Sequence, residues 1–345
     1  MWKPAALITC LGVAASVAAA AVEPLRVDGL IAAVVTPQNA DGLSVNYTAV
    51  RTQAKYLSDT GVEMVFIAGT TGESLSLTID ERMLLVEEWE TVAPDFGITY
   101  IVHIGAESIL DVQALGAHAS QHGAVAVGMM PSVFFKPATI SALGAWVELA
   151  AASVPTLPLY YYHIPSQTGV DFNMYDLVVE VENRGIPNFA GVKYTGLYET
   201  RAFPDYMRAA AFNEGKYEML CGREELTVEA MAVGTKGYIG SQFNHCGDIY
   251  AAIVAETDVA KRNAKQLAAI ELLLDWINGV PAGVDGNKMM MLLAGVNVGP
   301  GRPPSVPPSA DDFASLKAKV VAWCSGATNG GLFNPQPKIC ESVLN

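Results

Sequence analysis

From about residue 29 onward, short apolar segments rich in β-branched and aromatic residues alternate with longer segments in which apolar residues recur at every third or fourth position. The short segments have the length and composition of buried strands, and they lie at residues 30–36, 64–68, 99–104, 124–129, 156–162, 189–193, 217–221 and 237–240. The longer segments have the helical period, and they lie at residues 45–59, 79–92, 109–121, 140–151, 174–183, 200–213, 226–232 and 249–256. The pattern predicts eight repeats of a strand followed by a helix.

Strands that alternate with helices pair in parallel through right-handed crossovers. These strand segments are apolar almost without interruption, which is typical of a sheet covered on both faces. We therefore predict an α/β fold, a closed (β/α)8 TIM barrel, with an open doubly wound sheet as the alternative. Further helical patterns lie at residues 259–278, 286–294 and 310–323. The predicted organisation is a barrel over residues 22–258, C-terminal helices packed on it over 259–323, and a tail over 324–345.

The first residues have the composition of a secretory signal peptide. A single positive charge at Lys3 precedes an Ala/Val/Leu-rich run over residues 5–22, and four alanines at 18–21 suit a cleavage site. An uncleaved membrane anchor is the alternative, because the run is just long enough to span a bilayer. Its high alanine content makes it a weak anchor. We therefore predict a signal peptide over residues 1–21, no stable membrane span after its removal, and a secreted or secretory-pathway location.

The sequence has five cysteines, and Cys10 lies within the predicted signal peptide. Cys324 and Cys340 bracket a segment rich in Gly, Asn and Pro that has no helical or strand period. In an oxidising compartment we expect these two residues to form a disulfide that fixes the tail. Cys221 and Cys246 have apolar neighbours in the sequence and are predicted to be free, buried thiols.

Composition and charge narrow the classes of partner. Of the 345 residues, 51% are hydrophobic and 16% are charged, which is enough for one large core in a single domain. The formal net charge is −14 and no run of Lys or Arg is present, so we expect no nucleic-acid partner. His118 and His122 have helical i, i+4 spacing but lack the glutamate of an HExxH motif. They are interpreted as surface residues, and no metal site is predicted.

A single lysine, Lys193, follows the apolar segment 188–192 and ends the sixth predicted strand. Burial of an ammonium group is costly and favours the neutral amine. A neutral amine in a dry cavity is a nucleophile for carbonyl carbon, which is the requirement for Schiff-base catalysis. The alternative is a lysine whose stem packs at the strand end while its charged group remains in water.

Polar segments follow other predicted strands, and the carboxyl ends of barrel strands meet at one mouth, where catalytic groups gather. The segment GTTGES at residues 69–74 offers hydroxyls and backbone N–H groups that suit a carboxylate. The segment 160–169 begins with three tyrosines, one of which could transfer protons to and from a substrate. One or two of the three are expected to be packing residues, because neighbouring strand residues face opposite sides.

Five motifs of this chain resemble, in the same order, those of the dihydrodipicolinate synthase/N-acetylneuraminate lyase family of class I pyruvate-dependent aldolases. They are GTTGES, YYYHIPSQTG, GVKYT, GREE and IGSQFN, which begin at residues 69, 160, 191, 222 and 239. The resemblance covers residues 29–323. It implies a (β/α)8 barrel with C-terminal helices, a homotetramer, and catalysis without a metal or organic cofactor. On this pattern Lys193 forms the Schiff base with pyruvate and Tyr162 handles protons. Thr70 and Thr71 would bind the pyruvate carboxylate.

Within this family the second substrate is indicated by other positions. Synthases that act on aspartate semialdehyde usually carry an arginine in the loop after the strand-five proline, where this chain has Gln167. The segment 163–170 is more similar to that of the sialate-cleaving members. In those members a Gly-x-(Asp/Glu)-Glu motif holds sugar hydroxyls, although its acidic third position is usually aspartate. The implied sugar-binding residues of this chain are Gly222, Glu224, Glu225, Thr195 and Ser241.

The resemblance implies reversible cleavage of N-acetylneuraminate, a sialic acid, to N-acetylmannosamine and pyruvate. Two alternatives remain. One is a dihydrodipicolinate synthase or another 2-keto-3-deoxy acid aldolase. The other is a secreted barrel that binds sialic acid or pyruvate without turnover. The second alternative is motivated by the leader and by Phe134 and Phe135, which occupy the segment from which the family's neighbouring subunit supplies a tyrosine.

Overall fold

The computed structural model describes residues 22–196, 202–279, 283–326, 329 and 331–345. The predicted signal peptide therefore lies outside the described residues, as does the beginning of the helix predicted from residue 200. Within the described part of the chain, no helix combines the length and the apolar character needed to cross a bilayer.

The strands form a closed barrel in sequence order, and every pair of neighbours is parallel. The ring closes because β1 pairs with β8, which confirms the barrel and excludes the open sheet. The strands are β1 Gly29–Ala33, β2 Met64–Ile67, β3 Thr99–His103, β4 Ala126–Met129, β5 Leu159–His163, β6 Phe189–Tyr194, β7 Glu218–Cys221 and β8 Gly237–Gly240.

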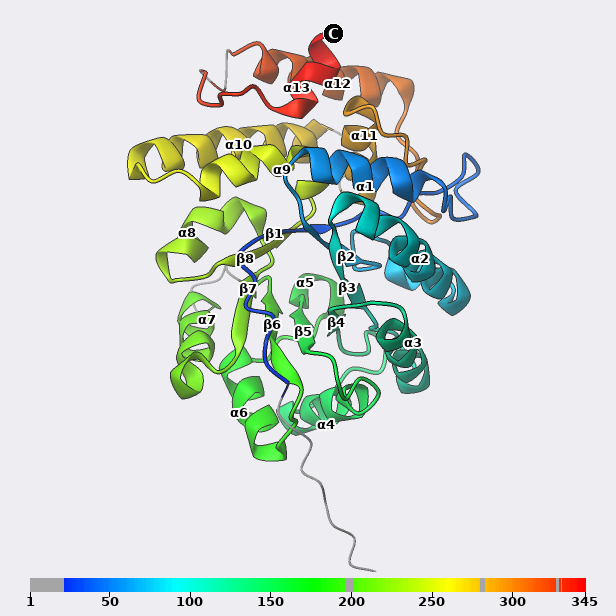
Figure 1. Cartoon of the computed structure of the whole chain (residues 1–345), viewed down its shortest axis with the longest axis vertical. Helices are drawn as coiled ribbons and strands as arrows, with labels where there is room; N and C mark the ends of the chain where they lie inside the picture. The colour runs from blue at the N-terminus through cyan, green and yellow to red at the C-terminus, as the bar shows by residue number, and fades with distance from the viewer. Residues whose placement is uncertain (1–21, 197–201, 280–282, 327–328, 330) are drawn as a thin grey trace, which may run out of the picture.

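Helices surround this barrel on the outside (Figure 1). They are α1 Ala49–Asp59, α2 Ile79–Val92, α3 Ile109–Gln121, α4 Ile140–Ala151, α6 Met174–Arg184, α7 Ala202–Ala211, α8 Thr227–Ala232 and α9 Phe243–Val254, with the one-turn helix α5 Pro165–Thr168 after β5. The 3-10 segments are η1 Ser74–Ser76, η2 Ala93–Phe96, η3 Phe212–Gly215 and η4 Glu224–Leu226. A capping box between Thr78 and Glu81 begins α2, as the sequence spacing predicted.

Helix α9 begins six residues before the predicted start at residue 249. Its first turn holds the polar residues Asn244 and His245, whose side chains are nevertheless fully buried. Asn244 Nδ2 donates to Ala33 O, and His245 Nε2 contacts Asn287 Oδ1. Tertiary hydrogen bonds therefore offset the cost of burying this polar turn, and a hydrophobic pattern could not reveal it.

The apolar core has two parts, one inside the barrel and one between the strands and the outer helices. The barrel interior is filled by Ile31, Ala33, Phe66, Ile101, Ala126, Met130, Tyr160, Tyr162, Ile164, Ala190, Leu220 and Ile239. Leu25 and Val27, just before β1, pack against this interior cluster. The filled interior leaves the carboxyl ends of the strands as the place where polar side chains can surround a ligand.

The C-terminal helices are α10 Val259–Gly279, α11 Val284–Leu293, α12 Ala310–Cys324 and α13 Lys338–Leu344. They lie together at one side of the barrel, beside α1 and α9 (Figure 1). Helix α10 packs on α9 and on α12, while α13 packs on α9 and α12. The sequence did not predict α13, because a helix of two turns shows too little of the helical period.

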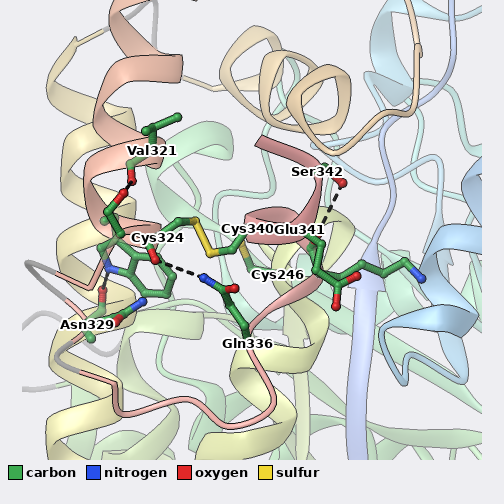
Figure 2. Close-up of a disulfide and its surroundings, with 12 residues drawn as sticks. Cys246, Val321, Cys324, Asn329, Gln336, Cys340, Glu341 and Ser342 are labelled. Carbon is green, nitrogen blue, oxygen red and sulfur yellow. Dashed lines mark hydrogen bonds between the residues drawn. A yellow bond between two sulfur atoms is a disulfide. The ribbon is translucent and has the colours of Figure 1, made fainter. Parts of the chain in front are cut away.

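The predicted disulfide between Cys324 and Cys340 is present and joins α12 to α13 (Figure 2). Gln336 Nε2 donates to the carbonyl of Cys324, and the backbone N–H of Lys338 donates to Asp248 on α9. The tail is therefore held to the body of the molecule by covalent and polar contacts. Cys221 and Cys246 are free and buried, as predicted.

Candidate active site

Lys193 lies on β6 directly beside Tyr162 on β5, because the register pairs these two residues across the strands. Its side chain points into the barrel and is buried, with 4% of the residue exposed. The Nζ atom lies 3.9 Å from the centre of the Tyr162 ring and 4.5 Å from that of Phe66. The alternative of a lysine with its charged group in bulk water is therefore wrong.

Burial of Lys193 changes the acid–base equilibrium of its amine. Desolvation lowers the pKa from 10.5 to about 7, while the negative charge of Glu224 acts in the opposite direction. The unprotonated amine is therefore well populated at neutral pH, unlike that of an exposed lysine. This is the form that attacks a carbonyl carbon.

Tyr162 lies beside this amine, with 5% of the residue exposed. Burial raises the pKa of its phenol to about 12, and a hydrogen bond with Thr70 partly offsets the effect. The other two tyrosines of β5 are packing residues, as the sequence analysis anticipated for one or two of the three. Tyr160 fills the barrel interior and donates to Glu218, whereas Tyr161 belongs to the outer core.

The GTTGES turn between β2 and α2 has an unusual backbone conformation. Ala68 and Glu73, which flank its central residues, adopt left-handed φ values of 53° and 59°, a conformation that is costly for non-glycine residues and is often found at functional sites. At Gly72 an added Cβ would lie 2.9 Å from Ala68 Cα and 3.0 Å from Val34 O. The turn is therefore compact, and both Thr70 and Thr71 line the cavity described below.

A buried ion pair holds this turn against the C-terminal region. Lys288 Nζ on α11 lies 2.7 Å from Glu73 Oε2, and both side chains are at least nine-tenths buried. The other oxygen of Glu73 accepts a hydrogen bond from the backbone N–H of Arg302. The Arg302 guanidinium in turn binds both carboxylate oxygens of Glu81 on α2. The sequence analysis did not identify Glu73, Lys288 or Arg302 as residues that support the site.

The residues after β7 and β8 contact one another through Glu224. Its Oε1 atom accepts hydrogen bonds from the backbone N–H and the hydroxyl of Ser241, at 3.0 and 2.8 Å. Gly222 is required by packing, because a Cβ there would lie 2.6 Å from Thr195 Cγ2 and 2.8 Å from Tyr194 O. Beside these residues, burial raises the pKa of Glu225.

One cavity of about 300 Å³ collects all nine residues predicted from the sequence. They are Lys193, Tyr162, Thr70, Thr71, Thr195, Gly222, Glu224, Glu225 and Ser241. Ser166, Gln167 and Arg223 also line this cavity, although the sequence analysis assigned them no contact. Arg223 Nε donates to Thr195 O, and its Nη1 lies 3.6 Å from Glu225 Oε1. This guanidinium therefore adds a positive charge at the rim.

A larger hollow of about 690 Å³ lies elsewhere, between the segment after β1 and the C-terminal helices. Its charged residues include Lys288, which is paired with Glu73, and Asp285, which accepts hydrogen bonds from Gly301 and Ser305. These groups already have protein partners. The smaller cavity is the better candidate for chemistry, because it contains the buried amine of Lys193 and the phenol of Tyr162.

Phe134 and Phe135 lie in the loop between β4 and α4, and they are 78% and 79% exposed. Neither residue lines the cavity. Glu107 fixes this loop by accepting hydrogen bonds from three consecutive backbone N–H groups and from the Ser132 hydroxyl. Burial tends to raise the pKa of Glu107, but these hydrogen bonds hold it at about 2.

Comparison with known proteins places the chain in a family. Residues 26–322 match the model of the dihydrodipicolinate synthetase family. The chain is 34% identical to the N-acetylneuraminate lyase of Gallus gallus, with 87% of this chain and 98% of that protein covered. It is 32% identical to the solved N-acetylneuraminate lyase of Proteus mirabilis, with a TM-score of 0.78 over 86% of this chain and 99% of the other. The sialic acid aldolase of Aliivibrio salmonicida is 30% identical, with a TM-score of 0.80 over 86% and 97% of the two chains. The chain therefore belongs to the dihydrodipicolinate synthetase family.

Proposed function

We propose that this protein is a class I aldolase that cleaves N-acetylneuraminate reversibly to N-acetylmannosamine and pyruvate. The observation that carries the proposal is the buried amine of Lys193, with its pKa lowered to about 7, in one cavity with Tyr162, Thr70 and Thr71. The N-acetylneuraminate lyases similar to this chain support the choice of substrate.

In the first step, the neutral amine of Lys193 attacks the C2 ketone of the open-chain sugar. Tyr162 donates its proton to the hydroxyl of the resulting carbinolamine, which leaves as water and gives a protonated imine. The raised pKa of Tyr162 suits this role, because it keeps the phenol protonated until an acid is needed. Thr70 and Thr71 hold the substrate carboxylate beside the reacting carbon.

In the second step, the phenolate of Tyr162 takes the proton of the C4 hydroxyl while the C3–C4 bond breaks. The electron pair of that bond moves into the imine and gives an enamine, and N-acetylmannosamine leaves as the aldehyde. The positive imine close to the Tyr162 ring stabilises the phenolate by charge attraction. Protonation of the enamine and hydrolysis then release pyruvate and restore Lys193.

The other polar groups that line the cavity suit the sugar chain. Glu224, Glu225, Thr195 and Ser241 offer carboxylate and hydroxyl oxygens, and Gly222 packs against Thr195 where no side chain would fit. Carboxylates that accept hydrogen bonds from sugar hydroxyls provide specificity, because a substrate without those hydroxyls leaves buried acceptors unpaired.

The proposal is tested by two measurements on the purified protein. Pyruvate release from N-acetylneuraminate should be saturable, and borohydride reduction in the presence of pyruvate should leave a covalent adduct on Lys193. Labelling of a different lysine, or none, would contradict the Schiff-base mechanism. Preferred condensation of pyruvate with aspartate semialdehyde would instead indicate a synthase, and binding of sialic acid without pyruvate release would indicate a non-catalytic barrel.

We also propose that the protein assembles as a homotetramer. The exposed rings of Phe134 and Phe135 contact each other edge to face, with their centres 4.9 Å apart, on a loop fixed by Glu107. An exposed aromatic pair on an ordered loop is typical of a protein–protein contact. Light scattering should give four times the monomer mass, and Phe134→Ser with Phe135→Ser should reduce it. The control Val259→Ser removes another exposed apolar side chain and should leave the mass unchanged.

A secreted or secretory-pathway location is proposed from the leader and from the disulfide between Cys324 and Cys340. Disulfides of this kind persist in oxidising compartments and are rare in the cytosol. Expression with the native N-terminus followed by N-terminal sequencing of secreted protein should give a start near residue 21 or 22. Retention of residue 1 in protein that fractionates with membranes would indicate an uncleaved anchor.

A further inference from the structure

Four side chains that can bind metal ions meet on the outside of the barrel, away from the cavity. Glu87 and Glu90 lie on α2, and His118 and His122 lie on α3 or at its end. The two helices are neighbours in the outer ring (Figure 1). Because residues three or four positions apart share one face of a helix, each pair faces the other across the groove between the helices.

The four groups are already close to one another. His118 Nε2 lies 3.1 Å from Glu87 Oε1, and His122 Nδ1 lies 2.8 Å from Glu90 Oε2. The two imidazole rings are stacked with their centres 4.1 Å apart. One potential ligand atom from each of Glu87, His118 and His122 lies within 4.8 Å of the others. The histidine side chains are 14% and 29% exposed, so a cation can enter from solvent.

We propose that Glu87, His118 and His122 bind a divalent transition-metal cation such as Zn²⁺, which joins α2 to α3. Zinc prefers imidazole nitrogen and carboxylate oxygen at about 2.0–2.2 Å. The cation takes the place between His118 Nε2 and Glu87 Oε1, with small side-chain rotations bringing the donor atoms to bonding distance. A water molecule completes four ligands in this arrangement.

Glu90 has a separate role in this site. It accepts a hydrogen bond from His122 Nδ1, which fixes the ring orientation and leaves the Nε2 lone pair available to the cation. A carboxylate that holds the second nitrogen of a histidine ligand is the usual support of protein zinc sites. Without a cation, the same four groups form two His–Glu contacts, and that simpler arrangement is the alternative.

The other histidines and the described cysteines of the chain are poorly placed to bind such a cation. The sequence has five histidines, and the other three, His103, His163 and His245, are buried at 2% exposure or less. Among the described cysteines, Cys324 and Cys340 form a disulfide, and Cys221 and Cys246 are buried. Histidine-dependent binding at the surface therefore reports on this site.

The experiment uses the full, disulfide-bonded protein after treatment with a chelator, titrated with zinc chloride alone in a calorimeter. One equivalent of Zn²⁺ should bind at pH 7.5. His118→Ala and His122→Ala should each lower the affinity more than tenfold, and Glu90→Gln should lower it about tenfold.

Two variants on the same helices serve as controls. Gln121→Ala removes an exposed side chain beside His122, and Glu88→Gln neutralises the carboxylate next to Glu87. Both should bind Zn²⁺ as the original chain does, and all variants should retain pyruvate release because none alters the cavity.

A second readout does not depend on variants. Anomalous diffraction at the zinc edge from crystals soaked at a few equivalents of Zn²⁺ should show a peak between α2 and α3. The absence of saturable binding, a zinc peak at another position only, or undiminished affinity in the His118→Ala/His122→Ala double variant would overturn the proposal.

Discussion

At the scale of single residues, the protonation of Lys193 controls the proposed chemistry. Burial, and not a neighbouring cation, is the main cause of its lowered pKa. We predict that kcat/KM for N-acetylneuraminate rises about tenfold per pH unit below pH 7 and levels off above it, because only the neutral amine attacks the ketone. A pH–rate profile checks this, and a curve that stays flat from pH 5 to pH 8 would contradict it.

The same pKa predicts how Lys193→Met affects stability. The folded-state pKa of about 7 lies below the ordinary value of 10.5, so between these pH values the unfolded chain binds more protons than the folded chain. The original protein therefore gains stability as the pH rises through this window. Lys193→Met should be inactive but more stable than the original protein below pH 7, and its advantage should shrink toward pH 10.5. Urea unfolding at pH 6 and pH 10 measures both differences.

Tyr162 gives a second prediction at this scale. Tyr162→Phe keeps the ring beside Lys193 but removes the proton donor, so kcat should fall by a factor between about 10² and 10⁴ while KM changes little. Trapping of the pyruvate imine with borohydride should persist, although more slowly. Tyr161→Phe is the matched control on the same strand, because its phenol lies in the outer core, and it should leave kcat within about twofold.

Lys193 was identified because it ends an apolar strand and because the ordered motifs around it resemble those of a known aldolase family. Arg223 and Glu73 were not recognised, since a charged residue in a polar loop has no distinctive pattern. Their positions depend on partners far along the chain, such as Lys288 for Glu73. Only the packing of α11 against the turn after β2 brings these two charges together.

At the scale of elements, the turn between β2 and α2 is held by a helix that follows the barrel. Lys288→Met should lower the free energy of unfolding by about 3–5 kcal/mol, because it leaves the buried carboxylate of Glu73 unpaired. It should also raise KM more than it lowers kcat, since Thr70 and Thr71 lose their fixed backbone. Denaturant unfolding and steady-state kinetics measure the two effects.

The control for this ion pair is Lys236→Met. Lys236 lies 3.4 Å from Asp28, but both side chains are about 70% exposed at the opposite end of the strands. Its loss should change the free energy of unfolding by less than about 1 kcal/mol. Equal effects of the two substitutions, on stability and on KM, would show that the Glu73–Lys288 pair does not position the turn.

Helices in which apolar residues recur at helical spacing over several turns were predicted well, whereas short helices and polar helical turns were not. The regular helices around the barrel match their patterns because one face of each packs on the sheet. The first turn of α9 was missed because Asn244 and His245 satisfy their polar groups through tertiary contacts. Helix α13 was missed because its stability depends on its disulfide and on α9, and not on its own sequence period.

At the scale of the whole molecule, the disulfide and the cavity belong to different parts of the structure. None of the cavity-lining residues comes from α12 or α13. Replacement of Cys324 and Cys340 by alanine opens a loop with a sequence separation of 16. The free energy of unfolding should fall by about 3 kcal/mol, while kcat and KM for N-acetylneuraminate stay unchanged. Urea unfolding and steady-state kinetics check this, and a loss of activity at full stability would contradict it.

The sequence by itself determined the repeated strand–helix order and the pairing of Cys324 with Cys340, and it singled out Lys193 and Tyr162 as the amine and the phenol of the proposed reaction, because periodicity and ordered motifs can be read along the chain. Only the tertiary structure decided that the barrel closes and that Lys193 is dry enough for its pKa to fall. It also decided that α11, a helix beyond the barrel, holds the turn that carries Thr70 and Thr71. Those features depend on which segments, far apart in the sequence, pack together and exclude water. A pattern of neighbouring residues does not contain that information.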